Sequence, residues 1–345
     1  MKGNRSQAVA PPSSGPSRGQ PGVSLRVLLQ VFLLGTLALQ AGCDSDPVRP
    51  LIPPRGSAPL TYFELAWNPG GDSLGFFHIP VDSVWYDPRT GESGYTTLDS
   101  LAGWWTTAAA TNSARELRLR EELQYVAVHY PTGRVAALHT TLGTRTVVVA
   151  PLVGMVPDLT RASPLPVFGF APSWNGAGDS LAFSIFQGQF ISASDGSGSR
   201  PIQVGVGPLG WDPLGHAVIA AEEDSAPHTG YRIVRADLDS LVKHGLFASQ
   251  TEVLRRPRYS PDGSRIAYIT QPLAGGDLHL CVAGRNGEAP RRVFARAIAD
   301  GYSWGPDSKR ISVVTYSPKD FSADGNQVWI VNVENGSYIQ VTHGK

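Results

Sequence analysis

Side chains that could hold a metal ion are present but scattered. No two histidines stand at the close spacing typical of metal ligands, although the chain has eight: His78, His129, His139, His216, His228, His244, His279 and His343. We therefore expect structural roles for the histidines, and we predict no bound metal and no other cofactor. Two of them, His129 and His216, fall inside a repeated turn sequence.

Two smaller features could also carry chemistry. Glu222, Glu223 and Asp224 form an acidic cluster whose carboxylates would suit calcium, although a solvated turn is the simpler interpretation. Cys281 falls in an apolar run, which predicts a buried and unreactive thiol. Because the chain has only two cysteines, a small fold held together by several disulfides is excluded.

The sequence contains no recognisable catalytic motif. We find no Gly-x-Ser-x-Gly turn for a nucleophilic serine, no His-Glu-x-x-His zinc motif and no phosphate-binding loop. We therefore expect a protein that is not an enzyme. Its 29 basic and 29 acidic residues balance to a net charge of zero, without long runs of one sign. A nucleic-acid partner is not expected, because such a partner requires a basic surface.

The N-terminal region has the organisation of a secretory signal. Residues 1–26 carry Lys and Arg but no acidic residue, and residues 27–39 are mostly apolar. Small residues then precede Cys43. This order is typical of signal peptides, and the apolar run is short for a membrane span. An uncleaved signal anchor is the alternative.

The residues before Cys43 resemble the bacterial lipobox. Leu39-Gln40-Ala41-Gly42-Cys43 has a small pair before the cysteine, but Gln40 stands where the family prefers an aliphatic residue. The resemblance implies a lipoprotein signal peptide over residues 1–42, a lipid on Cys43 and anchoring to a membrane of the bacterial cell envelope. Residues 43–59 are rich in proline and predict a flexible tether. An ordinary signal peptide with an incidental cysteine is the other interpretation.

A short turn sequence recurs in the rest of the chain and indicates the elements that would position any site. Each copy has an aromatic residue or histidine, then a turn containing Pro, Asp or Gly, then an alternating apolar run. Pro presets φ for a turn and Gly accepts the positive φ that follows, so each copy predicts a β-hairpin. The six copies are marked by Trp67 and Gly71; His129 and Gly133; Trp174 and Gly178; Trp211 and Gly215; Tyr259, Asp262 and Gly263; and Trp304 and Asp307.

Further short apolar runs follow most copies of the hairpin. Four short strands per repeat are the signature of a propeller blade. We therefore predict an all-β, six-bladed β-propeller with four-stranded antiparallel blades over residues 60–345. The core of residues 259–263, with blade ends such as Val341-Thr342, resembles the repeat of TolB-type propellers, a WD-like family. A β-sandwich with recurring turns is the alternative.

The segment around residues 99–124 does not fit the repeat. We expect an insertion there, containing a short helix near Ser113, although the alternation from Glu116 also permits a strand. A seventh, degenerate blade in this segment also stays open. The pair Trp104 and Trp105 is expected to plug one end of the propeller rather than to form an exposed binding patch.

Closure of the ring is the last architectural expectation. The final repeat supplies its own fourth strand, which ends in Val341-Thr342. The ring is therefore expected to close by packing alone, or by an edge strand from residues near Leu51 and Ile52.

These features together predict an exported, membrane-anchored propeller that binds a protein, peptide or glycan on one face without catalysis. Loops from every blade gather around one axis, which suits recognition. The related propellers of peptidases accompany a hydrolase domain, and we expect no room for one after the last blade. The resemblance leaves two alternatives: a lyase or hydrolase with a metal in the central channel, and a TolB-like subunit of an envelope complex.

Overall fold

Strands dominate the computed structural model of the chain, because alternating apolar runs recur between turns that contain Gly and Pro. The only helical elements among the described residues are two turns of 3-10 helix, η1 (Asp99–Leu101) and η2 (Leu159–Arg161). Within that part of the chain, no helix is long and apolar enough to span a membrane. The structure describes residues 62–86, 89, 93–110, 114–119, 123–141, 144–165, 169–185, 188–202, 204–223, 230–316 and 326–343.

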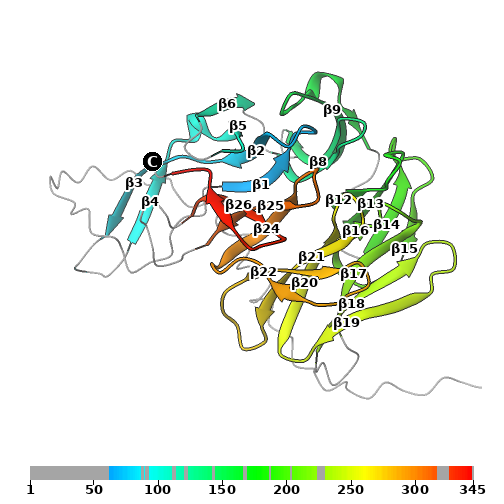
Figure 1. Cartoon of the computed structure of the whole chain (residues 1–345). Helices are drawn as coiled ribbons and strands as arrows, with labels where there is room; N and C mark the ends of the chain where they lie inside the picture. Colours follow the sequence, from blue (N-terminus) through cyan, green and yellow to red (C-terminus); the bar gives the residue numbers. More distant parts are fainter. Residues whose placement is uncertain are drawn as a thin grey trace, which may run out of the picture. The chain divides into compact units, whose positions relative to one another are not determined.

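Six antiparallel sheets follow one another in chain order (Figure 1). Blade 1 contains β1 (Tyr62–Trp67), β2 (Ser73–His78), β5 (Gly103–Ala108) and β6 (Arg115–Leu119). Blade 2 contains β7 (Leu123–His129), β8 (Arg134–Thr141) and β9 (Thr144–Val153), and its outer edge is split between β10 (Val156–Pro157) and β11 (Ser163–Pro164). Blade 3 contains β12 (Phe170–Trp174), β13 (Ser180–Ile185), β14 (Gly188–Ala193) and β15 (Arg200–Ile202).

The second half of the ring has the same plan. Blade 4 contains β16 (Val206–Trp211), β17 (Ala217–Glu223), β18 (Tyr231–Asp237) and β19 (Lys243–Ser249). Blade 5 contains β20 (Glu252–Tyr259), β21 (Arg265–Pro272), β22 (His279–Gly284) and β23 (Arg291–Arg292). Blade 6 contains β24 (Ile298–Trp304), β25 (Arg310–Thr315), β26 (Val328–Asn332) and β27 (Tyr338–Gln340). The predicted six-bladed propeller is confirmed.

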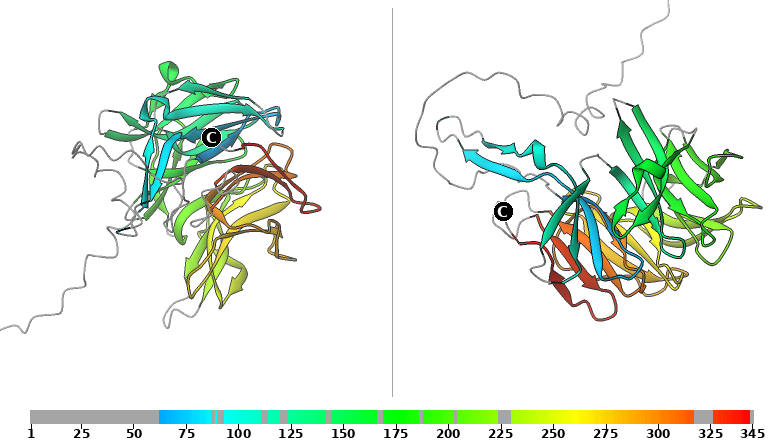
Figure 2. Two further views of the ribbon diagram at one scale, coloured as in Figure 1. Left: turned by 90° about the vertical axis from the view of Figure 1, so that its left-hand side faces the viewer. Right: turned by 90° about the horizontal axis from the view of Figure 1, so that it is seen from above.

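The prediction for residues 99–124 is wrong in two respects. The inserted element lies earlier, as a separate hairpin of β3 (Val81–Tyr86) and β4 (Ser93–Thr97) that projects from blade 1 (Figure 2). The expected helix is instead β6, because charged and apolar residues alternate there with the period of an edge strand. Since β5 and β6 complete blade 1, the described residues contain no seventh blade.

The paired tryptophans neither plug the ring nor form a patch. Trp104 is fully buried between blades 1 and 2, where its indole N–H donates to the carbonyl of Met155 at 2.9 Å. Trp105 points to the other face of the same sheet, because neighbours along a strand alternate. Its indole N–H donates to the carbonyl of Leu101 at 3.1 Å, and it keeps part of its surface exposed.

The hydrophobic core is divided among the junctions between blades. Each of the six apolar clusters draws its residues from two neighbouring blades. The cluster between blades 1 and 6, for example, joins Trp67 and Phe76 to Val314 and Ile330. Burial of apolar surface therefore stabilises the contacts between blades.

Three motif tryptophans bind their blade to the one before it. Trp174 and Trp304 donate their indole N–H groups to carbonyls on the innermost strands of blades 2 and 5, at 3.0 and 3.3 Å. Trp67 makes the same contact with the carbonyl of Ser303 in blade 6, at 3.2 Å. These three recurring aromatics are thus explained by the junctions between blades.

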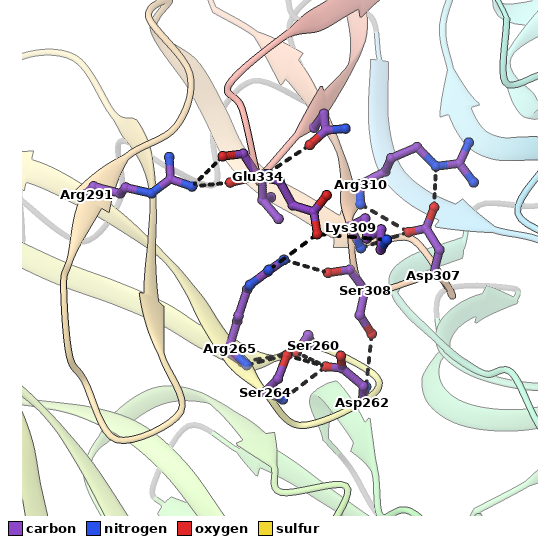
Figure 3. A network of polar contacts seen from close by, with 12 residues as sticks. Ser260, Asp262, Ser264, Arg265, Arg291, Asp307, Ser308, Lys309, Arg310 and Glu334 are labelled. Carbon is purple, nitrogen blue, oxygen red and sulfur yellow. Dashed lines mark hydrogen bonds and ion pairs between the residues drawn. The ribbon is translucent and has the colours of Figure 1, made fainter.

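An arginine at the start of the second strand strengthens three of these junctions. It donates to the carbonyl of a turn residue with positive φ in the next blade: Arg134 to Gly178 at 3.2 Å, Arg265 to Ser308 at 3.3 Å and Arg310 to Gly71 at 2.8 Å. Figure 3 shows the junction of blades 5 and 6, where the Ser308 hydroxyl also accepts the Asp262 N–H at 3.0 Å. The guanidinium groups of Arg134 and Arg310 also lie over the indole rings of Trp174 and Trp67.

The ring closes through one of these junctions. Blade 6 takes all four of its strands from the end of the chain, as expected. The Trp67 indole and the Arg310 guanidinium then join the first blade to the last. This contact accounts for closure by packing, and the edge strand proposed near Leu51 and Ile52 lies outside the described residues.

Removal of the indole that closes the ring should weaken the whole propeller. We expect Trp67→Ala to lower the free energy of unfolding by about 3 kcal/mol or more, because it opens a cavity between blades 1 and 6. Urea unfolding followed by circular dichroism measures the loss. Trp105→Ala is the matched control, because it removes an equal side chain that is already partly exposed. Equal losses in both variants would contradict this account of closure.

Candidate binding site at the centre of the ring

The innermost strand of every blade contains a bulge. The pairing register shifts in β1, β7, β12, β16, β20 and β24, the first strand of each sheet. Five of these bulges hold a residue with positive φ: Glu64, Tyr125, Ala171, Gly207 and Arg256. A residue other than glycine is strained in this conformation, by about 1 kcal/mol or more, and such strain concentrates at functional sites. The centre of the ring is therefore the first place to look for a site.

Two bulge side chains meet across this centre. The Arg256 guanidinium lies 5.7 Å from the centre of the Tyr125 ring. Blades 5 and 2 face each other in a ring of six, so this cation–π contact spans the axis. Arg256 also pairs through Nε with Oδ1 of Asp300 in blade 6, at 3.1 Å. The contact narrows the centre of the ring at this depth.

Glu64 provides a carboxyl group at the same depth. It accepts a hydrogen bond from the backbone N–H of Val126 at 3.2 Å, and the N–H of Tyr125 also contributes. Burial raises the pKa of Glu64 above its usual value, although the positive charges of Arg256 and Arg258 and these two N–H groups oppose the shift. Its side chain therefore holds a proton more readily than an exposed glutamate does.

Arg258 lies two residues closer to the hairpin turn of blade 5. Burial lowers the pKa of its guanidinium, the neighbouring Arg256 lowers it further, and Tyr302 and Glu64 oppose the change. Among the residues that the structure describes, none accepts a hydrogen bond from this guanidinium. The side chain lies deep in the ring but keeps some accessible surface. A ligand in the centre could therefore reach its donors.

Two tyrosines beside Arg258 are held by backbone carbonyls. The Tyr130 hydroxyl donates to the carbonyl of Trp304 at 2.5 Å. The Tyr302 hydroxyl lies 2.6 Å from the carbonyl of Arg256 and 2.7 Å from that of Ala267. Burial raises the pKa of both hydroxyls, so they remain neutral. Their fixed positions give the centre rigid aromatic walls.

The residues singled out from the sequence have structural places. The described motif residues lie in the hairpin turns and blade junctions. His129 illustrates this role, because its ring nitrogens contact the Thr132 hydroxyl at 2.7 Å and the Gly176 carbonyl at 3.1 Å. Cys281 is buried in β22 as predicted, and burial raises the pKa of its thiol to about 11. Cys43 lies outside the described residues.

The acidic cluster is only partly described. Glu222 belongs to strand β17 rather than to a turn, and it pairs with Arg232 and Lys243. Asp224 lies outside the described residues. Among those that are described, no three His, Cys, Asp or Glu side chains gather closely enough to hold a metal ion.

Sequence reasoning missed the central residues. Their signal was a polar residue three or four positions before the motif aromatic, as at Glu64, Tyr125, Arg256 and Asp300. Within a single repeat such a residue looks like any exposed strand position. Only alignment of the repeats would have shown that these positions converge.

Comparisons with known proteins agree on the fold. No family model and no curated protein matches the sequence. Among solved structures, TolB from Acinetobacter baumannii is 13% identical, with 81% of this chain and 79% of that chain covered and a TM-score of 0.55. A chain of a nidogen/laminin complex is 10% identical, with 82% and 93% covered and a TM-score of 0.50. At such low identity, the likeness shows a TolB-like propeller fold alone.

The raised pKa of Glu64 should appear in the pH dependence of stability. The folded state holds the Glu64 proton more tightly than the unfolded state, in which the pKa of this carboxyl is about 4.5. The protonated Glu64 therefore makes its full contribution to stability below about pH 4.5, and this contribution is lost as the pH rises through the pKa of Glu64 in the folded state. We expect the free energy of unfolding of the wild type, relative to that of Glu64→Gln, to fall as the pH rises.

Urea unfolding at a series of pH values measures this difference. Glu116→Gln, on the exposed outer strand of the same blade, is the matched control. A wild-type advantage that instead grows with pH would show that the two arginines, rather than burial, dominate the ionisation of Glu64.

Proposed function

We propose that this chain is an exported, lipid-anchored protein of the bacterial cell envelope whose propeller binds a partner without catalysing a reaction. The observation that carries the proposal is the Arg258 guanidinium, which lies deep in the ring without an acceptor among the described residues. Around it gather the polar and aromatic side chains of Glu64, Tyr130 and Tyr302, and a binding site needs a few convergent polar groups of this kind.

The state of the central polar groups supports binding over catalysis. Nucleophilic catalysis needs a nucleophile beside a general base. In the described centre, the hydroxyls of Tyr130 and Tyr302 are committed to backbone carbonyls, and the Glu64 carboxyl accepts backbone N–H groups. Such groups are fixed in place, so they form a preorganised surface for a ligand.

A second candidate is a subunit of an envelope complex. The fold similarity to TolB supports this role. In that case the partner would be another protein of the complex, and the same ring would dock it.

Lipid attachment is testable at the predicted cysteine. We expect the wild-type protein to incorporate radiolabelled palmitate and to sediment with membranes. Cys43→Ser should lose the label and the membrane association, because the thiol is the site of acylation. Cys281→Ser is the control, since that thiol is buried in β22 and should leave the label unchanged. A Cys43→Ser protein that keeps its label would contradict the lipid anchor.

The binding function is testable by photo-crosslinking in intact membranes. A photoreactive phenylalanine at position 170 lies beside Tyr125 in the centre, whereas one at position 247 lies on the outermost strand of blade 4. We expect a discrete crosslinked species from position 170 alone. No crosslink from position 170, or stoichiometric Mn or Zn on the purified protein that only a chelator removes, would contradict non-catalytic binding at this centre.

A further inference from the structure

The guanidinium donors of Arg258 have no acceptor among the described residues. Two other arginines, in blades 5 and 6, have carboxylate acceptors: Arg256 pairs with Asp300, and Arg310 pairs with Asp307. The Arg258 guanidinium also keeps accessible surface, so its donors are available to a ligand. The strained bulges beside it, at Glu64, Tyr125 and Arg256, are an independent sign of a functional position. Both observations indicate a ligand that supplies the missing acceptor.

The charges around Arg258 limit what that acceptor is. Arg256 adds a positive charge, but Asp300 balances it. Among the described residues, Glu64 is the acidic group that acts on Arg258 directly, and backbone N–H groups of blade 2 hold its carboxyl. The planar guanidinium suits a carboxylate or a phosphate. A singly charged carboxylate fits better, because a doubly charged phosphate would be repelled more strongly by Glu64.

The width of the centre limits how the carboxylate arrives. The contact between Arg256 and Tyr125 crosses the axis and leaves no space for a sugar ring between these two side chains. Arg258 and Tyr302 lie on the side of this contact that leads to the hairpin turns, since each is closer to the turn of its own blade. A carboxylate on a thin, flexible chain can enter from that face.

The innermost strands favour a peptide as that chain. Each of them pairs with only one neighbour in its sheet, so its second edge faces the centre. Such an edge presents backbone N–H and C=O groups that an extended peptide can bind. Tyrosine walls also suit a protein partner, because tyrosine is enriched at protein interfaces.

We infer that the centre of the ring binds a carboxylate of an acidic peptide segment, which enters from the face of the hairpin turns and is received by Arg258. This inference rests on the proposed binding function and names the chemistry of the partner. Arg258 acts as the specificity-determining donor. Tyr130 and Tyr302 restrict the width of the entrance.

The experiment measures binding of fluorescent peptides to the full chain in detergent micelles by anisotropy. The probes are hexaglutamate with an amidated C-terminus, hexaglutamine with a free C-terminus, and fully amidated hexaglutamine. The first offers only side-chain carboxylates and the second only a terminal carboxylate, so together they identify the source. The third should not bind. Unlabelled trigalacturonate, added as a competitor and tested directly by calorimetry, represents a glycan.

Arg258→Gln should weaken binding of the carboxylate probe by about tenfold or more, because it removes a charged hydrogen-bond donor. Arg291→Gln is the matched control, since it makes the same charge change on the outermost strand of the same blade (Figure 3). At a pH above the folded pKa of Glu64, where this carboxyl is ionised, Glu64→Gln should tighten binding severalfold, because a like charge disappears. This gain keeps the test decisive even where Arg258→Gln folds poorly, which the thermal unfolding of each variant will show.

Three outcomes would overturn the inference. Equal weakening by Arg258→Gln and Arg291→Gln would show general charge attraction. Binding of trigalacturonate with no binding of either carboxylate peptide would show that the ligand is a glycan. A crosslink from position 170 that survives Arg258→Gln would reject this role for Arg258 while leaving the binding function intact, whereas the absence of any crosslink would reject the binding function itself.

Discussion

The structure depends on contacts between blades rather than within them. A single four-stranded sheet of this size has two faces to cover and no core of its own. All six apolar clusters lie at junctions, so each blade is buried only by its neighbours. The ring must therefore be complete, and the first and last blades must meet with the same precision as any other pair. The indole of Trp67 and the guanidinium of Arg310 provide that contact.

Closure has a consequence at the centre. Six innermost strands converge there, and each bends through a bulge, which increases local twist and redirects a side chain. Glu64, Tyr125 and Arg256 hold strained backbone positions at these bends. The strain is tolerated because the junctions on either side fix the strands. The bulges in the innermost strands of the ring thus decide which side chains lie at its centre.

The sequence predicted the ring but not its centre. The aromatic, the turn and the alternating run are local signals, so Trp174 or Gly263 could be assigned from a few neighbouring residues. Residues 99–124 were misassigned because a local helix signal near Ser113 competed with a strand pattern, and only pairing of β5 with β2 and β6 decided between them. Glu64 and Arg258 carry no local signal. They come close together only when the whole ring closes, and no short stretch of sequence shows this.

The same residues build the scaffold and fix the candidate site. The Trp304 indole, which holds blade 6 to blade 5, donates to the carbonyl of Arg258. The Tyr302 hydroxyl, two residues earlier, contacts the carbonyl of Arg256. The backbone of both arginines is therefore held by the junction, which leaves their guanidinium groups to the centre. A scaffold whose repeat motif anchors the site in this way needs no separate domain to position a ligand, because packing of the blades already does so.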